Sequence, residues 1–324
     1  MRCFSDSAFL FKTTRKKKKG KIFADGLPGG WFYCFFIACI NSTLFPGEIL
    51  VLYALLGYVM IAVCRFSTRT IAFIAVFLLL QPFEWIQLIY TLINNEFIVN
   101  PLFDVPYWEI VNTVQKEGSF LELCKTTIVT GNIANMGWML LHGRVTQTAG
   151  LFMVGMLIGR SKVFLYSEEN IKLWTNVFII ATFAFFPIYG LAAVLPDFIS
   201  QETLLIPSTL LLKSLSNIAF TGILFAGVIL VYYLTKCRGV LHQLAPYGRM
   251  SLTNYLSQSL IGGFLFYNWG LGLYRYTGIT VCVLMGIGMF FLQFLFCRWW
   301  LRSHRQGPLE WLWKKATWIN VRKG

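Results

Sequence analysis

Long apolar runs separated by short polar segments define this chain. Eight of these runs contain about 18 or more residues with few charges, and this is the length that an α-helix needs to cross a bilayer. The apolar–polar alternation of an outer-membrane β-barrel strand is absent. The pattern predicts an all-α, polytopic transmembrane helical bundle of about eight spans, at residues 27–45, 47–64, 70–94, 134–159, 173–194, 213–235, 250–268 and 277–298.

The composition excludes a soluble globular domain and a disordered chain. The 324 residues are 56% hydrophobic and only 13% charged, whereas soluble domains carry roughly 25% charged residues. The eight cysteines form no CxxC pair, and the three histidines lack the spacing of metal ligands. We therefore expect neither a disulfide framework nor a metal site.

The charge distribution predicts how the chain crosses the membrane. A formal net charge of +14 would suggest a nucleic-acid partner for a soluble protein. Here the basic residues lie in short loops and tails, which membrane topology explains, so no nucleic acid is expected. With the N-terminus in the cytoplasm, 23 of the 28 Lys and Arg residues fall on the cytoplasmic side and 4 on the other. The positive-inside rule therefore predicts a multi-pass protein of the bacterial inner membrane with both termini inside.

Three parts follow from these patterns. Residues 1–26 form a basic cytoplasmic leader, and residues 27–298 form the transmembrane domain, with one long outer loop at 95–133. Residues 299–324 form a tail rich in tryptophan and basic residues. Such a tail is expected to lie on lipid headgroups, which makes the lipid bilayer the one general partner that the sequence implies.

Two charged residues lie inside predicted spans, where a charge costs about 2.5–3.5 kcal/mol on insertion scales and usually faces a partner or a wet cavity. Glu84 and Arg144 each lie 10 residues from the outer end of their span. Equal depth favours either an ion pair or a cavity that both residues line. Glu84, His142 and Arg144 thus become candidates for catalysis, and Gln81, Glu84 and Arg144 become candidates for a substrate cavity.

The seventh predicted span carries polar side chains on one face. At 100° per residue, the leucines between residues 252 and 260 form an apolar stripe, whereas the other side holds Asn254, Tyr255 and Gln258. This face either packs on other helices through polar contacts or borders a hydrated pocket. Arg249, at the predicted cytoplasmic end, is placed to meet either a phosphate-bearing ligand or a lipid phosphate.

Four sequence blocks carry a resemblance to a known family. Residues 46–57 read PGEILVLYALLG, residues 155–160 read GMLIGR, residues 248–259 read GRMSLTNYLSQS, and residues 306–313 read QGPLEWLW. These blocks resemble the bacterial membrane family named domain of unknown function 418, or YeiB-like, over roughly residues 40–318. That family is similar in architecture to membrane acyltransferases, which pass an acyl group from a cytoplasmic carrier to an acceptor across the bilayer.

The chain departs from that family pattern in two places. Members usually begin with one or two further spans that carry an Asp-x-x-Arg-Gly motif, which this sequence lacks, so we expect an N-terminally short chain. Many members also have a histidine before the glycine–acid block, where this chain has Asn41. The arginine and histidine that carry the chemistry in the acyltransferases therefore have no counterparts here.

Three functions stay open at this point. The first is acyl transfer to an envelope or small-molecule acceptor, with acyl-coenzyme A as co-substrate, no bound cofactor, and Arg249 at the carrier site. The second is a transporter whose substrate meets Glu84 and Arg144. The third is a non-catalytic component of a membrane assembly. For the enzyme, His142 and Glu84 are the visible candidates for a general base.

Overall fold

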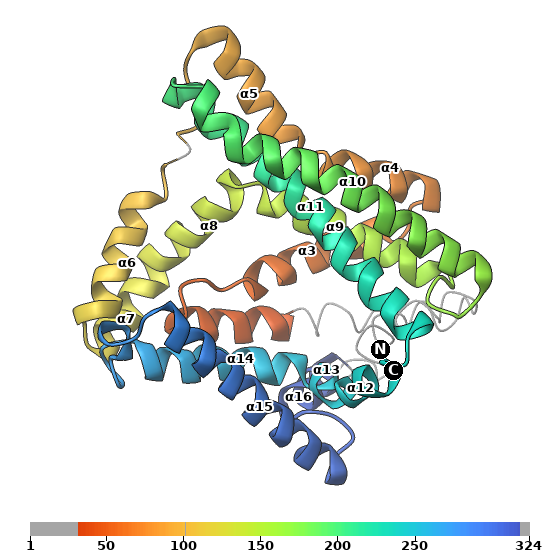
Figure 1. Cartoon of the computed structure of the whole chain (residues 1–324). Coiled ribbons are helices and arrows are strands. Elements are labelled where there is room, and N and C mark those ends of the chain that lie inside the picture. Colours follow the sequence, from red (N-terminus) through yellow and green to blue (C-terminus); the bar gives the residue numbers. More distant parts are fainter. Residues whose placement is uncertain (1–31, 101, 318–324) are drawn as a thin grey trace. The chain divides into compact units, whose positions relative to one another are not determined.

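The structure, a computed structural model, describes residues 32–100 and 102–317. All regular secondary structure within these residues is helical, which confirms the predicted all-α class (Figure 1). In chain order the helices are Phe32–Leu44, α3 Leu50–Val63, α4 Thr68–Leu79, α5 Pro82–Asn94, α6 Val105–Glu117, α7 Phe120–Thr126, the π-helix η2 Thr127–Gly131, α8 Asn132–Leu141, α9 Arg144–Arg160, α10 Glu168–Phe198, α11 Glu202–Leu234, α12 Arg238–Gln243, α13 Ala245–Arg249, α14 Ser251–Phe266, the 3₁₀-helix η3 Leu273–Arg275, α15 Ile279–Ser303 and α16 Pro308–Thr317.

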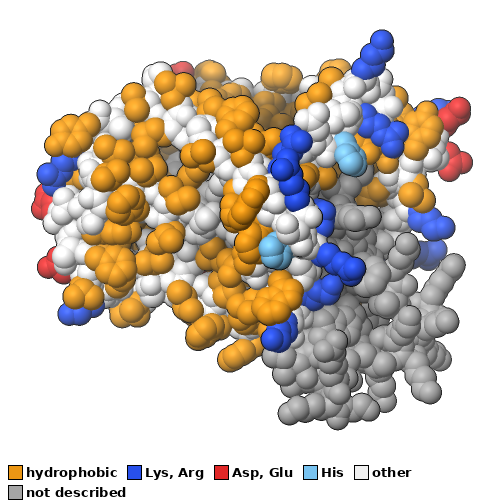
Figure 2. All heavy atoms as spheres, turned by 90° about the horizontal axis from the view of Figure 1, so that it is seen from below, with side chains coloured by type: hydrophobic (Ala, Val, Ile, Leu, Met, Phe, Trp, Pro, Cys, Tyr) orange, Lys and Arg blue, Asp and Glu red, His pale blue; other side chains and the backbone are white. Residues whose placement is uncertain are grey.

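The long helices have the properties of membrane spans. α10, α11 and α15 are each long and apolar enough to cross a bilayer, and α4 and α5 meet the same test together, with a bend of 42° between them. Only 6% of the apolar window of α10 and of α15 is buried, and Figure 2 shows hydrophobic side chains spread across the surface. Lipid is the natural cover for apolar surface of this extent, so this is a membrane protein.

The described residues form two compact units. The first contains residues 32–61, 104–136 and 242–317, and the second contains residues 62–103, apart from 101, and 137–241. The chain passes from one unit to the other within α3, between α5 and α6, within α8 and within α12. The candidate residues divide between the units accordingly.

The predicted third span is interrupted at Gln81. This residue lies between α4 and α5 with its backbone in the left-handed region, at φ 60°. Pro82 follows as the first residue of α5, and a proline disfavours the right-handed helical conformation in the residue before it. Because a left-handed backbone costs a non-glycine residue about 1–2 kcal/mol, the surroundings of Gln81 must compensate for that cost.

The predicted fourth span is interrupted at Gly143. This glycine separates α8 from α9 at φ 63°, a conformation that glycine adopts at little steric cost. The depth assigned to Arg144 from the sequence assumed one straight helix. The structure corrects that assumption, because Arg144 is the first residue of a separate helix, α9.

In the second unit, α9 packs closely on α4. A Cβ atom added at Gly150 would lie 2.8 Å from Leu79 Cγ, so the absence of a side chain allows this approach. Within the described residues, a Cβ at Gly155, the first glycine of the GxxxG pattern, would meet nothing within 4 Å. Gly150, rather than Gly155, therefore makes the close contact between these helices.

α10 and α11 form an antiparallel hairpin in the same unit, since only residues 199–201 connect them (Figure 1). The start of α10 and the second half of α11 pack through aromatic side chains, with the Trp174 and Phe225 rings 5.5 Å apart. Trp174 is 4% exposed, and its indole N–H donates to the Val163 carbonyl at 3.0 Å. This buried tryptophan fixes the connection from α9 against the hairpin.

Within the first unit, a glutamate of the C-terminal segment connects α16 to α14. The Glu310 carboxylate, in α16, accepts hydrogen bonds from the Thr253 backbone N–H at 3.0 Å and from its hydroxyl at 2.6 Å. These bonds satisfy a free N–H at the start of α14. They hold α16 against the N-terminal turn of α14.

Candidate functional site

The two helix breaks contact each other in the second unit. With its nitrogen facing α9, the fully buried Gln81 amide donates to Glu84 Oε2 at 3.1 Å, to the Gly143 carbonyl at 3.2 Å and to Thr146 Oγ1 at 3.0 Å. A Cβ atom at Gly143 would overlap the Glu84 and Gln81 side chains. Hydrogen bonds from one break to the other thus offset the strained backbone at Gln81.

Glu84 and Arg144, which are both described, do not form an ion pair, one of the two arrangements that the sequence left open. Arg144 Nη1 donates to Gln147 Oε1 at 2.8 Å, and its guanidinium carbon lies 5.4 Å from the centre of the Trp138 ring. Glu84 is 3% exposed, and its carboxylate accepts a hydrogen bond from the Gln81 amide instead. The break explains the difference, because it places Arg144 in the first turn of a separate helix instead of on a continuation of α8.

Arg144 lines a cavity of about 490 Å³ that side chains of α10 and α11 also line. His142, Arg144 and Lys213 contribute basic groups, and the lining contains no Asp or Glu. Lys213, Asn217 and Phe220 are exposed, so the cavity opens at the surface of the unit. The other lining residues are aromatic, aliphatic or small and polar: Phe185, Tyr189, Ala192, Ala193, Leu210, Ser214 and Ser216. Its volume falls in the range of small-molecule sites.

Two features of the cavity wall concern its chemistry. Arg144 Nε is buried without a hydrogen-bond partner, and an unpaired buried donor costs about 1–3 kcal/mol. The His142 ring stacks on Trp138, and its Nδ1 lies 3.0 Å from the Trp138 carbonyl. With Nδ1 as the donor, Nε2 is the acceptor or base of that imidazole.

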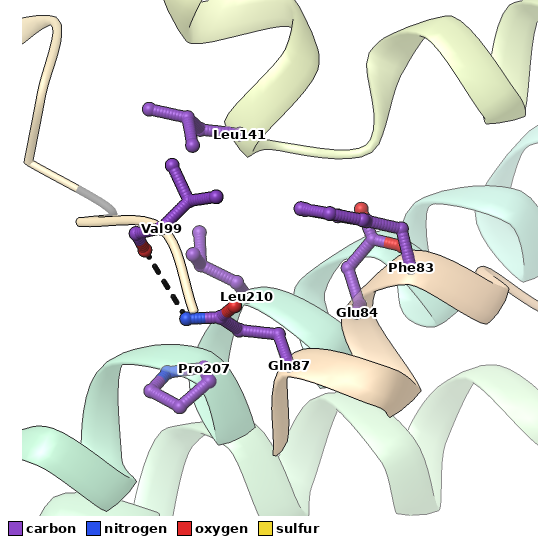
Figure 3. Close-up of a pocket in the computed structure, with 7 residues that line it drawn as sticks. All are labelled: Phe83, Glu84, Gln87, Val99, Leu141, Pro207 and Leu210. Atoms are coloured by element: carbon purple, nitrogen blue, oxygen red, sulfur yellow. Dashed lines mark hydrogen bonds between the residues drawn. The ribbon is translucent and has the colours of Figure 1, made fainter. Parts of the chain in front are cut away.

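Glu84 lies on a different, much smaller cavity (Figure 3). This space of about 20 Å³ lies between Glu84 and Gln87 of α5 and Pro207 and Leu210 of α11. Gln87 Nε2 donates to the Val99 carbonyl at 3.2 Å, as the dashed line in Figure 3 marks. A space of this size holds about one water molecule, and Arg144 is not among the residues that line it.

The polar face of the predicted seventh span packs on another helix. In the first unit, Gln258 Nε2 donates to Gln293 Oε1 at 2.9 Å, and Gln293 Nε2 donates to the Asn254 carbonyl at 3.1 Å. Arg249 donates to the Arg305 carbonyl. None of Arg249, Asn254 and Gln258 lines either cavity. The polar residues of α14 therefore pack on α15, which is one of the two alternatives that the sequence left open.

Tyr255, the remaining candidate, has a partner that the sequence analysis did not select. Its hydroxyl donates to Glu48 Oε1 at 3.1 Å, and Glu48 is 1% exposed. Asn135 of α8 donates to the Glu48 carbonyl at 2.6 Å. The available signal was an acidic residue between two apolar runs, directly after Pro46 and Gly47. This signal was not specific, because acidic residues are common at helix starts, where they interact favourably with the helix dipole.

With this geometry established, comparison with known proteins places the chain in a family. A family model described as "Protein of unknown function (DUF418)" matches residues 158–320, about half of the chain. The chain belongs to this family. The DUF418 match begins in the last turn of α9 and contains the cavity residues of α10 and α11, including Lys213. His142, Arg144 and Glu48 precede it.

Several members of the curated protein set are similar to shorter parts of this chain. The uncharacterized protein YxaH of Bacillus subtilis (strain 168) is 42% identical over 93 residues, which cover 29% of this chain and 23% of YxaH. The uncharacterized protein YeiB of Escherichia coli (strain K12) is 45% identical over 74 residues, which cover 23% of this chain and 19% of YeiB.

A third relative has a similar extent of match. An uncharacterized 39.9 kDa protein in the amylase 3′ region of Bacillus acidopullulyticus is 34% identical over 97 residues, or 29% of this chain and 27% of the relative. The matches thus cover less than a third of each relative's length. No solved structure matches the chain.

Proposed function

We propose that this protein binds an organic anion in the cavity of the second unit and carries it across the bacterial cytoplasmic membrane. The observation that carries the proposal is Arg144 Nε, a buried donor without a partner on the wall of a cavity that contains no Asp or Glu. A carboxylate, sulfonate or phosphate ligand would satisfy this donor and meet Lys213 as a second cation. The aromatic wall would hold an apolar portion of the same ligand.

The interrupted spans support transport over simple binding. Carriers commonly bind their substrates between helices that are broken inside the membrane, where the free ends of half-helices meet the ligand. Here α4–α5 and α8–α9 are both broken, the two breaks are hydrogen-bonded to each other, and Arg144 follows one of them. Broken backbone at membrane depth is tolerated where it is buried in protein or lines a cavity.

The membrane arrangement forms part of the proposal. We propose a multi-pass protein of the inner membrane, with about eight spans and both termini in the cytoplasm. The distribution of 23 basic residues on one side and 4 on the other supports it, as do three helices of spanning length. In this arrangement the short apolar helices Phe32–Leu44 and α3 form the described parts of two further spans.

Ligand binding tests the proposal directly. The protein in nanodiscs is titrated by calorimetry with benzoate, octanoate and hexyl phosphate, which combine one anionic group with an apolar body. We expect saturable binding that Arg144→Gln weakens by about 10- to 100-fold, because a charge-assisted hydrogen bond contributes about 1.5–3 kcal/mol. Arg238→Gln, at an exposed arginine of the same unit, is the matched control and should bind normally. Equal affinity in both variants would contradict the proposal, and no binding of any probe by folded protein would favour a structural role.

Acyl transfer is the second candidate, and His142 is the observation in its favour. Nδ1 of this cavity histidine lies 3.0 Å from the Trp138 carbonyl, and in the tautomer that donates to this carbonyl Nε2 would be the base that activates an acceptor hydroxyl. Purified protein incubated with acetyl-coenzyme A and a hydroxylated acceptor such as glycerol would then release free thiol. His142→Gln should abolish the release without changing anion affinity. Release at the background rate by wild-type protein would remove this candidate for these substrates.

A further inference from the structure

The first unit contains a buried carboxylate that neither cavity uses. Glu48 is 1% exposed and lies between the helix Phe32–Leu44 and α3. Its Oε1 accepts hydrogen bonds from the Leu50 backbone N–H at 2.6 Å and from the Tyr255 hydroxyl at 3.1 Å. Asn41 Nδ2 donates to its Oε2. Three separate segments of the chain therefore converge on one carboxyl group.

Every one of these donors is neutral. The titratable groups that face Glu48 are the thiols of Cys34 and Cys39, on the helix before it, and the hydroxyl of Tyr255 in α14, which itself lies near Tyr53 of α3. α8 contributes only the amide of Asn135. None of the described Lys, Arg or His side chains bonds to Glu48. A carboxylate enclosed in an apolar region without a counter-ion is costly, and taking up a proton removes its charge.

The neighbours of Glu48 can serve both of its protonation states. Asn41, Tyr255 and Ser259 each donate and accept hydrogen bonds. Asn41 Nδ2 also donates to Ser259 Oγ at 3.2 Å, and the Ile49 N–H lies 3.5 Å from the Tyr255 oxygen. Rotation of the Asn41 amide would present its Oδ1 to a protonated carboxyl, and the tyrosine hydroxyl can likewise turn. A fixed counter-ion would keep the carboxyl group ionised, whereas these groups can hydrogen-bond to either protonation state.

We infer that Glu48 is a reversible proton-binding site inside the membrane domain. The carboxylate takes one proton on an oxygen to become the neutral acid and returns it to become the anion, while Asn41 and Tyr255 reverse their hydrogen-bonding roles. The site gives the first unit a way to respond to a proton gradient.

Infrared spectroscopy of the full chain in nanodiscs tests this inference, because a protonated carboxyl group has a C=O stretch that the carboxylate lacks. We expect a carboxyl band in wild-type protein that disappears reversibly as the pH is raised and shifts in D₂O. The band should be missing from Glu48→Gln and present in Glu84→Gln, the matched control at the other buried glutamate. Tyr255→Phe removes a donor to the anion and should move the midpoint of the band to higher pH by about one unit.

Several outcomes would overturn the inference. They are a band that survives unchanged in Glu48→Gln, a Glu48 band that is present or absent at every pH where the protein is folded, and an unmoved midpoint in Tyr255→Phe. Replacing choline chloride with sodium chloride at constant pH is the control for a cation site. If sodium alone abolishes the band, Glu48 is a sodium site instead.

The consequence for transport rests on the proposed function and is measured separately. In proteoliposomes with radiolabelled benzoate, Glu48→Gln should still exchange benzoate across the membrane but should lose accumulation driven by an imposed pH gradient. Accumulation by this variant equal to wild type would show that the proton site does not drive transport. Absence of exchange by wild-type protein would contradict the proposed function and leave the infrared assignment of Glu48 as it is.

Discussion

The contact between the two helix breaks leaves no room for a side chain at Gly143. Its backbone lies at φ 63°, and an added Cβ would overlap Glu84 and Gln81. We predict that Gly143→Ala destabilises the protein by about 2 kcal/mol or more, since a left-handed alanine costs about 1–2 kcal/mol before any clash is counted. Thermal unfolding in detergent, followed by light scattering and tryptophan fluorescence, measures the change.

Gly155→Ala is the control for that substitution. This glycine is inside α9 with open space around its Cβ position among the described residues, and alanine favours a helix by about 0.5–1 kcal/mol over glycine. We expect Gly155→Ala to be neutral or stabilising. If the two variants unfold at the same temperature, the close contact at Gly143 does not contribute to the stability of the protein.

Single residues also show which parts of the candidate site the sequence could predict. Intramembrane charge is costly, so Glu84 and Arg144 could be selected from the sequence, and His142 and Arg144 do line one cavity. The pairing of Glu84 with Arg144 could not be judged, because it depended on a straight fourth span. Lys213 could not be selected, because it lies near the end of a predicted span, and only the structure places it in the cavity wall. The spacing of polar residues within one helix does not reveal which other helix lines the same cavity.

At the scale of helices, the contact between α4 and α9 depends on Gly150. A Cβ there would lie 2.8 Å from Leu79 Cγ and 3.3 Å from the Ala75 carbonyl oxygen. We predict that Gly150→Val destabilises the protein by about 1–3 kcal/mol, as overpacking of a close contact does. The double variant Gly150→Val with Leu79→Ala should recover part of this loss, and a double-mutant cycle of unfolding free energies measures the coupling. Purely additive effects would contradict the contact.

The short helix α7 should respond to pH through its N-terminal cap. Ser119 and Glu122 form a reciprocal capping box, with the Ser119 N–H donating to Glu122 Oε2 at 2.7 Å. That backbone N–H, followed by the Ser119 hydroxyl, lowers the pKa of Glu122 below its ordinary value. The cap therefore stabilises α7 above the pKa that the carboxyl has in the unfolded chain, and its contribution is lost as the pH falls through the lower folded-state pKa.

Hydrogen exchange of the α7 amides measures this effect. At each pH, wild-type protein is compared with Glu122→Gln, so that the intrinsic pH dependence of exchange cancels. We expect stronger protection in wild type near neutral pH and a difference that vanishes in acid. A difference of constant size at all pH values would mean that the charge of Glu122 plays no part in the cap.

Helix boundaries separate what the sequence could and could not predict at this scale. Apolar length identified α10, α11 and α15, because a spanning helix needs little more than an unbroken apolar run. The interruption at Gln81 was signalled by the proline that follows it, but the one at Gly143 was not, since a lone glycine is common inside membrane helices. The outer loop at residues 95–133 contains α6 and α7, and the helical spacing of the apolar positions between Asp104 and Thr127 does indicate helix there.

For the whole molecule, the number of spans decides on which side of the membrane each connection lies. If only α10, α11, α15 and the bent α4–α5 pair crossed the bilayer, the chain would have four spans. Both arrangements leave the two termini on the same side, so the location of the C-terminus cannot distinguish them. The connection between α10 and α11 can, because it is outside with eight spans and inside with four, and the connection after α11 has the opposite location.

Cysteine labelling therefore gives the decisive prediction about topology. Cys237, just after α11, is exposed, and Ser200 lies in the connection between α10 and α11. We expect that a membrane-impermeant maleimide applied to intact cells labels a variant whose only cysteine is Ser200→Cys and does not label one that retains only Cys237. Permeabilised cells should label both, which controls for reactivity. The reverse pattern in intact cells would establish the four-span order, and it would also reverse the positive-inside argument, because the basic groups around Cys237 would then face outward.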